Sequence, residues 1–157
     1  MNSHTIIWMS LIAYSLHILE EYTYNWKDWA VKVLKLPVDW TNFYMTNAIF
    51  LFLGVGCGAV GFDAPWLTLA FPAGLCINAV FFHVMPSLVT KVYSPGTFSA
   101  VVFYFPLTYF TYKIAGNAGV SAKDITFSWI IGALFMAWPI VLLKTKNLPF
   151  FNVSARK

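Results

Sequence analysis

The stretch 65-PWLTLAFPAGLCINAVFFHVM-85 decides the fold, because it contains no Asp, Glu, Lys or Arg. As a helix it is long enough to cross the roughly 30 Å of hydrocarbon in a bilayer. Similar apolar stretches lie at residues 5–22, 43–61, 97–114 and 125–143. Hydrophobic residues make up 59% of the 157 residues and charged residues only 10%, against roughly 25% in soluble domains. The sequence therefore predicts an all-α membrane protein, a single bundle of five transmembrane helices over residues 1–157.

Three prolines, Pro72, Pro106 and Pro139, fall inside these stretches. A helical bundle tolerates proline within its spans, since neighbouring groups satisfy the freed carbonyls. We therefore expect kinks at these positions and not helix ends. The first stretch has no basic leader and no small-residue cleavage site, so we expect it to be retained as a helix.

Residues 24–42, between the first two stretches, alternate aromatic and charged side chains. Trp26 and Trp29 are interleaved with Lys27, Asp28 and Lys32. This pattern is typical of an amphipathic helix that lies in the headgroup plane. We expect an interfacial segment here, and a plain connecting loop is the alternative.

The distribution of basic residues between the ends of the stretches predicts the orientation. One end holds most of them, namely Lys27, Lys32, Lys35, Lys91, Lys144, Lys146, Arg156 and Lys157, and the other holds Lys113 and Lys123. Because Lys and Arg accumulate in cytoplasmic loops, we expect a multi-pass membrane protein with its N-terminus outside and its C-terminus in the cytoplasm. Short basic pieces of this kind meet the lipid bilayer, so the net charge of +4 does not indicate nucleic-acid binding.

Small residues in the middle of the spans predict close packing. Gly54, Gly58 and Gly61 would let another helix approach closely, either within the chain or across a homodimer. Cys57 and Cys76 fall in the middle of predicted spans, where we expect small buried apolar residues and neither a disulfide nor a metal pair.

Ionisable side chains in or near the spans are the candidates for a functional site, because they cost most in hydrocarbon. His17, Glu20 and Glu21 have the spacing i, i+3 and i+4, which places them on one face of the first helix. Asn78 and His83 lie near the end of the third stretch, about 140° apart on a regular helix.

Two further features complete the candidate site. Pro86 is expected to distort the turn that carries His83, and Tyr93-Ser94-Pro95-Gly96 is typical of a turn. The predicted topology brings all of these polar groups to the cytoplasmic end of the bundle. They can therefore converge in one layer.

Three segments resemble, in this order, the motifs of the HXXEE family of integral membrane proteins. They are His17-Ile18-Leu19-Glu20-Glu21, the segment from Asn78 to His83, and Tyr93-Ser94-Pro95-Gly96. The resemblance covers about residues 14–96. It implies an integral membrane protein, and the polar motifs of that family suggest an enzyme without naming a reaction.

Imidazole and carboxylate groups together suit a divalent metal, zinc or iron. The predicted metal ligands are His17, Glu20, Glu21 and His83, and the predicted catalytic residues are Glu20, Glu21, Asn78 and Tyr93. One glutamate would complete the ligand set and the other would act as general base, while the asparagine and the tyrosine would bind substrate or orient a ligand. A site at membrane depth is entered most easily from lipid. We therefore expect a metal-dependent enzyme, hydrolytic or oxidative, acting on a lipid or other apolar substrate at the cytoplasmic face.

Three alternatives stay open at this point. Paired carboxylates in a partly dry site do not both ionise easily, and this suits a metal-free acid–base isomerase or cyclase of a lipid or isoprenoid. Intramembrane His and Glu also serve ion transport. A membrane-complex assembly subunit is the third alternative, and it predicts that His17 and Glu20 tolerate substitution.

Overall fold

The computed structural model describes residues 2–145, and every regular element in that range is helical. The elements are α1 (Ser3–Thr23), α2 (Trp26–Val33), α3 (Trp40–Val60), a short 3-10 turn (Gly61–Asp63), α4 (Pro65–Thr68), α5 (Ala70–Asn78), a π-helical turn (Ala79–Val84), α6 (Met85–Thr90), α7 (Thr97–Ser99), a second π-helical turn (Ala100–Tyr104), α8 (Phe105–Asn117) and α9 (Ala122–Thr145). The predicted all-α class is confirmed.

Three segments of the described chain are long and apolar enough to cross a membrane, namely Trp40–Asp63, Pro65–Thr90 and Ala122–Thr145. The prediction of five spans is thus confirmed in part. Helix α1 and the segment 97–117 coincide with the other two predicted spans in position, and their membrane crossing stays a prediction. Lys146, Arg156 and Lys157, on which the predicted orientation also depends, lie outside the described residues.

The helices continue through their prolines, as predicted. Pro72 lies inside α5 and Pro139 inside α9. Pro86 and Pro106 each stand just after a π-helical turn. A proline ring pushes against the carbonyl of the residue four positions earlier, so a wider turn directly before the proline is the local response.

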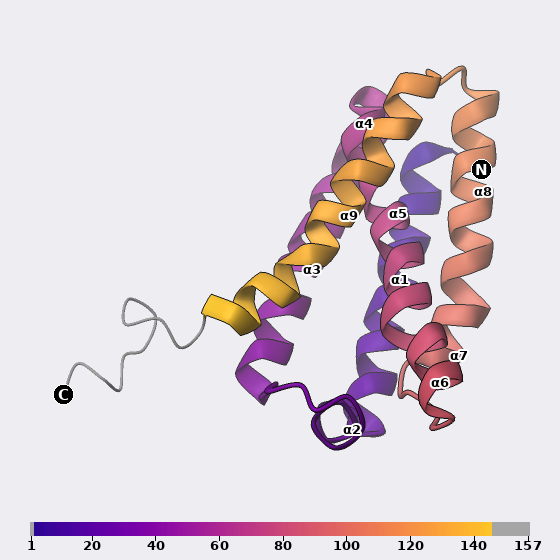
Figure 1. Ribbon diagram of the computed structural model, residues 1–157. Helices are drawn as coiled ribbons and strands as arrows, with labels where there is room; N and C mark the ends of the chain where they lie inside the picture. Colours follow the sequence, from indigo (N-terminus) through magenta and orange to yellow (C-terminus); the bar gives the residue numbers. More distant parts are fainter. Residues whose placement is uncertain (1, 146–157) are drawn as a thin grey trace.

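Helix α2 lies across one end of the bundle (Figure 1). The side chain of Asn25 caps its N-terminus by accepting a hydrogen bond from the backbone N–H of Asp28. Trp29 and Ala30 are buried against the bundle, whereas 77% of the Lys32 side chain is exposed. This amphipathic helix occupies the first part of the predicted interfacial segment.

The predicted glycine face packs inside the chain. A Cβ atom added at Gly54 would lie 2.6 Å from Cδ1 of Leu11, and one added at Gly58 would lie 2.9 Å from Cε2 of Trp8. Helix α1 therefore sits directly on the backbone of α3. This contact is the first of the two alternatives that the glycine spacing predicts. The cysteine within this face, Cys57, is buried and free.

Helix α9 approaches α5 closely at Gly132. A Cβ atom there would lie 2.9 Å from the backbone N of Gly74 and 3.0 Å from the backbone O of Ala70, and neither atom can swing away. We expect Gly132→Ala to force α9 outward at a cost of about 1–3 kcal/mol and to lower the midpoint of thermal unfolding in detergent. Gly56→Ala is the matched control, because nothing lies within 4 Å of a Cβ atom at that helical position. Equal midpoints for the two variants would contradict this packing.

Candidate metal centre

His17 and Glu21 of α1 meet His83 of the first π-helical turn inside the bundle. Oε1 of Glu21 lies 3.6 Å from Nε2 of His17 and 3.5 Å from Nε2 of His83. The two imidazole rings are edge to face, with centroids 4.6 Å apart. All three side chains are buried. One donor atom from each lies within 4.8 Å of the other two, so all three groups face one point.

Both Nε2 atoms are buried and have no hydrogen-bond partner. Such atoms are rare in folded proteins, because burying an unsatisfied polar group is unfavourable. Donors bound to a tetrahedral zinc at about 2.0–2.1 Å lie roughly 3.3–3.5 Å from one another. The two separations from Glu21, 3.6 Å and 3.5 Å, are close to that value. The cluster therefore fits a divalent ion held by two imidazoles and one carboxylate.

Two serines hold the histidines through their other ring nitrogens. Nδ1 of His17 lies 2.9 Å from Oγ of Ser99, and Nδ1 of His83 lies 3.3 Å from Oγ of Ser94. Each serine hydroxyl also lies within hydrogen-bonding distance of a backbone carbonyl, at 3.2 Å and 3.4 Å. When the hydroxyl donates to that carbonyl, the serine oxygen accepts from an Nδ1–H group, and this tautomer leaves the lone pair of Nε2 free for a metal.

The backbone of Gly96 closes over the two histidine rings. A Cβ atom there would lie 2.7 Å from Cε1 of both His17 and His83. The residue also has a φ angle of +94°, which glycine adopts at little cost. Glycine at this point of the turn is thus required by the histidines as well as by the backbone.

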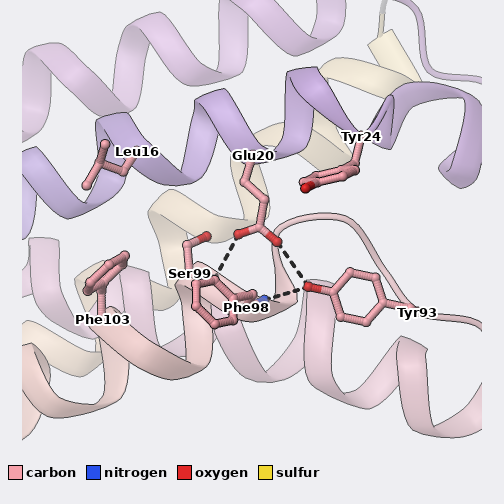
Figure 2. Close-up of a pocket in the computed structure, with 7 residues that line it drawn as sticks. All are labelled: Leu16, Glu20, Tyr24, Tyr93, Phe98, Ser99 and Phe103. Carbon is pink, nitrogen blue, oxygen red and sulfur yellow. Dashed lines mark hydrogen bonds between the residues drawn. The ribbon is translucent and has the colours of Figure 1, made fainter.

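Glu20 forms a separate cluster with the loop before α7 (Figure 2). Its Oε1 accepts hydrogen bonds from the Tyr93 hydroxyl at 3.0 Å and from the Gly96 N–H at 3.1 Å, and its Oε2 accepts from the Ser99 N–H at 2.8 Å. The Tyr93 oxygen accepts in turn from the N–H of Phe98 at 3.0 Å. Burial raises the pKa of the Tyr93 hydroxyl, so it keeps its proton at neutral pH. Both predicted catalytic residues of this cluster, Glu20 and Tyr93, lie outside the group of three donors, and they fix the segment 93–99, which carries both serines.

Glu20→Gln tests this structural role. A glutamine side chain offers one acceptor oxygen where three donors converge, so at least one backbone N–H loses its partner. We expect the variant to lose about 1–3 kcal/mol of stability, measured as a lower thermal midpoint in detergent. Asp63→Asn is the matched control, because it removes the same charge from an exposed residue. If the thermal midpoint of Glu20→Gln is as high as that of the control, the hydrogen bonds of Glu20 do not hold this segment in place.

Asn78 and Glu21 line a cavity of about 610 Å³, together with His17. Oδ1 of Asn78 is buried there without a hydrogen-bond partner. The Glu20 cluster instead borders a separate pocket of about 540 Å³, which meets a different face of α1. The structure thus divides the four predicted catalytic residues into two pairs.

Three polar residues near the histidines escaped the sequence analysis. Ser94 and Ser99 belong to the turn motif and to the helix start after it, and serine in a turn carries no signal of its own. Tyr104 is fully buried, its ring centroid lies 4.9 Å from that of His17, and its hydroxyl has no partner. For Tyr104, the one signal in the sequence was the nearby Pro106, because a proline indicates a distorted turn such as the π-helical turn that ends at Tyr104.

Comparison with known proteins identifies related sequences. The model of the family described as "Protein of unknown function with HXXEE motif" matches residues 8–111. A relative from Bacillus subtilis (strain 168), "Uncharacterized protein YrkK", is 28% identical over 141 residues, which cover 83% of this chain and 88% of the relative. No solved structure matches the chain. The matched family range contains the three donors and both serines, and it ends before α9.

Proposed function

This chain belongs to the HXXEE family, and from that premise we propose that it is a membrane-embedded, metal-dependent enzyme acting on a lipid or another apolar substrate. The observation that carries the proposal is the pair of buried, unpartnered Nε2 atoms that face Glu21. The family membership agrees with the resemblance of the three sequence motifs.

His17, Glu21 and His83 would hold the ion. Two imidazoles and one carboxylate are the ligand set of catalytic zinc sites with an open position, and also of non-haem iron sites. A divalent ion there would polarise a substrate oxygen or activate water. Zinc and iron are therefore both proposed, for hydrolytic and oxidative chemistry respectively.

The remaining residues of the site have positioning roles in this proposal. Ser94 and Ser99 keep each Nδ1 protonated, and Glu20 holds their loop against α1. Glu21 is the one carboxylate among the described residues that line the cavity. It would therefore ligate through Oε1, the atom that faces both imidazoles, and would accept a proton on Oε2.

We also propose that all five helical segments cross the membrane with the N-terminus outside. Apolar side chains on α1 and α8 support this, since Ile12 is 61% exposed and Tyr109 is 61% exposed. Figure 1 places α2 and α6 at one end of the bundle and the connection between α8 and α9 at the other. Most described basic residues belong to the first end, so the metal centre would lie near the cytoplasmic face.

Acid–base isomerisation or cyclisation without a metal is the second candidate. It is favoured by one observation, the approach of Glu21 to both imidazoles within 3.6 Å, which would form an ion pair if one histidine were protonated. In that case the carboxylate and an imidazolium would act as base and acid on an apolar substrate.

A lipid-conversion assay distinguishes the two candidates. Purified protein is incubated with a total lipid extract in three states: metal-loaded, chelated, and chelated with zinc or iron restored. The products are compared by mass spectrometry. We expect the metal-loaded protein to convert a lipid, chelation to abolish this conversion, and restored metal to recover it. The Glu21→Gln variant should convert no lipid in any of the three states. Conversion by chelated protein would assign acid–base chemistry instead, and no conversion by fully metal-loaded protein would contradict an enzymatic role.

A further inference from the structure

The cavity beside the metal centre is long and mostly apolar. Its apolar wall includes Phe43, Phe81, Phe82, Met136, Ile140 and Leu143. The lining residues of α9 run from Ala133 to Leu143, a rise of about 15 Å along the helix. In Figure 1, α9 lies near α5 at the upper end of the view and diverges from α1 toward the end that carries α2.

One end of the cavity reaches the interfacial segment. Trp26 of α2 and the residues Leu34, Leu36 and Val38 after it contribute to the wall. The other end reaches Tyr14 in the middle of α1, with His17 and Glu21 between the two. A chain lying in this space would therefore pass directly in front of the metal centre.

The polar side chains that line the cavity differ in whether they have hydrogen-bond partners within the protein. Asn47 accepts from the Tyr14 hydroxyl at 2.6 Å and donates to the Phe43 carbonyl at 2.9 Å. Asn42 takes part in the capping box of α3. Oδ1 of Asn78, by contrast, is buried and has no donor. A buried carbonyl oxygen without a donor is unfavourable, so this atom is suited to receive a hydrogen bond from a ligand.

The charges of the cavity limit the head group of such a ligand. No Lys or Arg is present among the described residues that line the cavity, and Glu21 supplies a buried carboxylate. In the protein without bound metal, an anionic head group would face that carboxylate with no side-chain cation to pair with. A neutral hydroxyl can donate to the Asn78 oxygen and still offer its own oxygen to a metal.

We propose that the cavity binds an amphiphile with one apolar chain and a neutral hydroxyl head, a long-chain or isoprenoid alcohol. Its chain lies along α9, and its hydroxyl donates to Oδ1 of Asn78. This inference rests on the proposed function only for the contact between the hydroxyl oxygen and the metal. Chain burial and the bond to Asn78 require no metal. A volume of about 610 Å³ is within the range of sites for one small ligand.

Fluorescence quenching in chelated protein tests the chain site. The probe is a long-chain alcohol brominated in the middle of its chain, which quenches tryptophans near it, and Trp26 lines the cavity. We expect saturable quenching by the alcohol. Ala137→Phe fills the cavity and should abolish the saturable component. Leu134→Phe, on the same helix at a position 66% exposed, is the matched control and should leave it unchanged.

The methyl ether of the same alcohol tests the head-group assignment, because it lacks the donor. Wild type should bind the alcohol about tenfold more tightly than the ether, and Asn78→Leu should bind the two equally. Quenching that is unsaturable, or identical in Ala137→Phe and Leu134→Phe, would overturn the chain site. Equal affinity of wild type for alcohol and ether would overturn the role of Asn78.

Metal content measured on separate, unchelated samples keeps the two proposals apart. Saturable alcohol binding by a protein that never holds metal would overturn the proposed function and leave this inference standing. A metal-loaded protein without saturable binding would overturn this inference alone.

Discussion

Replacing His17 or His83 by alanine is expected to lower the affinity for zinc or ferrous iron by more than about 100-fold. Changes to residues that merely orient a ligand already cost about 10–100-fold, and each of these substitutions removes one of three donors. The affinity is measured in detergent by competition with a chromophoric chelator. Elution as a single species in size-exclusion chromatography shows that each variant has folded.

His4→Ala is the matched control for these substitutions. His4 lies near the start of α1, the helix that carries His17, and its Nδ1 lies 2.9 Å from the carbonyl oxygen of Gly58. Its removal should leave metal affinity unchanged. Equal affinities of His4→Ala, His17→Ala and His83→Ala would place any bound metal outside the proposed centre.

Gly96→Ala is expected to have the second largest effect, because it disturbs the backbone and the metal centre together. A non-glycine residue at a φ of +94° costs of the order of 1–3 kcal/mol. Its Cβ atom would also press on both histidine rings, 2.7 Å from each Cε1. We expect metal affinity to fall at least about tenfold, the lower end of the range for orienting residues. The thermal midpoint should fall as well.

Gly119→Ala separates these two causes. Gly119 also has a positive φ, +77°, but nothing lies within 4 Å of a Cβ atom there. The control should therefore share the backbone cost and keep normal metal affinity. If Gly96→Ala and Gly119→Ala bind metal equally well, the loop backbone does not position the histidines.

The spacing of the HxxEE motif predicted that His17 and Glu21 of α1 lie close together, but not which of the two glutamates faces His83. Glu21 lies four positions after His17, so their approach follows from helix geometry alone. Glu20 lies about 100° around the helix from Glu21. Which glutamate would face His83 was not predictable, because that depends on where the loop before α7 lies. The N–H groups of Gly96 and Ser99 turn Glu20 into a structural carboxylate.

The angle between the side chains of Asn78 and His83 around the helix axis depends on a local distortion of the helix. A regular helix would place them about 140° apart. The intervening π-helical turn, Ala79–Val84, closes hydrogen bonds between residues five apart and brings such residues toward one face. Pro86 indicated a distorted turn, but sequence alone does not distinguish a kink from a π-helical turn.

The cavity was not predictable because it depends on how α9 is placed. Helix α9 carries no polar motif, and it packs mainly on α5 and α4, with Gly132 in its middle against the backbone of α5. From Ala133 onward its residues line the cavity. The cavity forms between helices distant in sequence, a tertiary feature without a local pattern.

The most direct test of the proposed function is the metal content of wild-type protein, purified in detergent, washed with a mild chelator and measured by elemental analysis beside His17→Ala and His83→Ala. We predict close to one zinc or iron per chain in wild type and almost none in either variant. Wild-type protein that is folded, holds no metal, and takes up neither zinc nor iron when they are supplied would contradict the proposed metal centre.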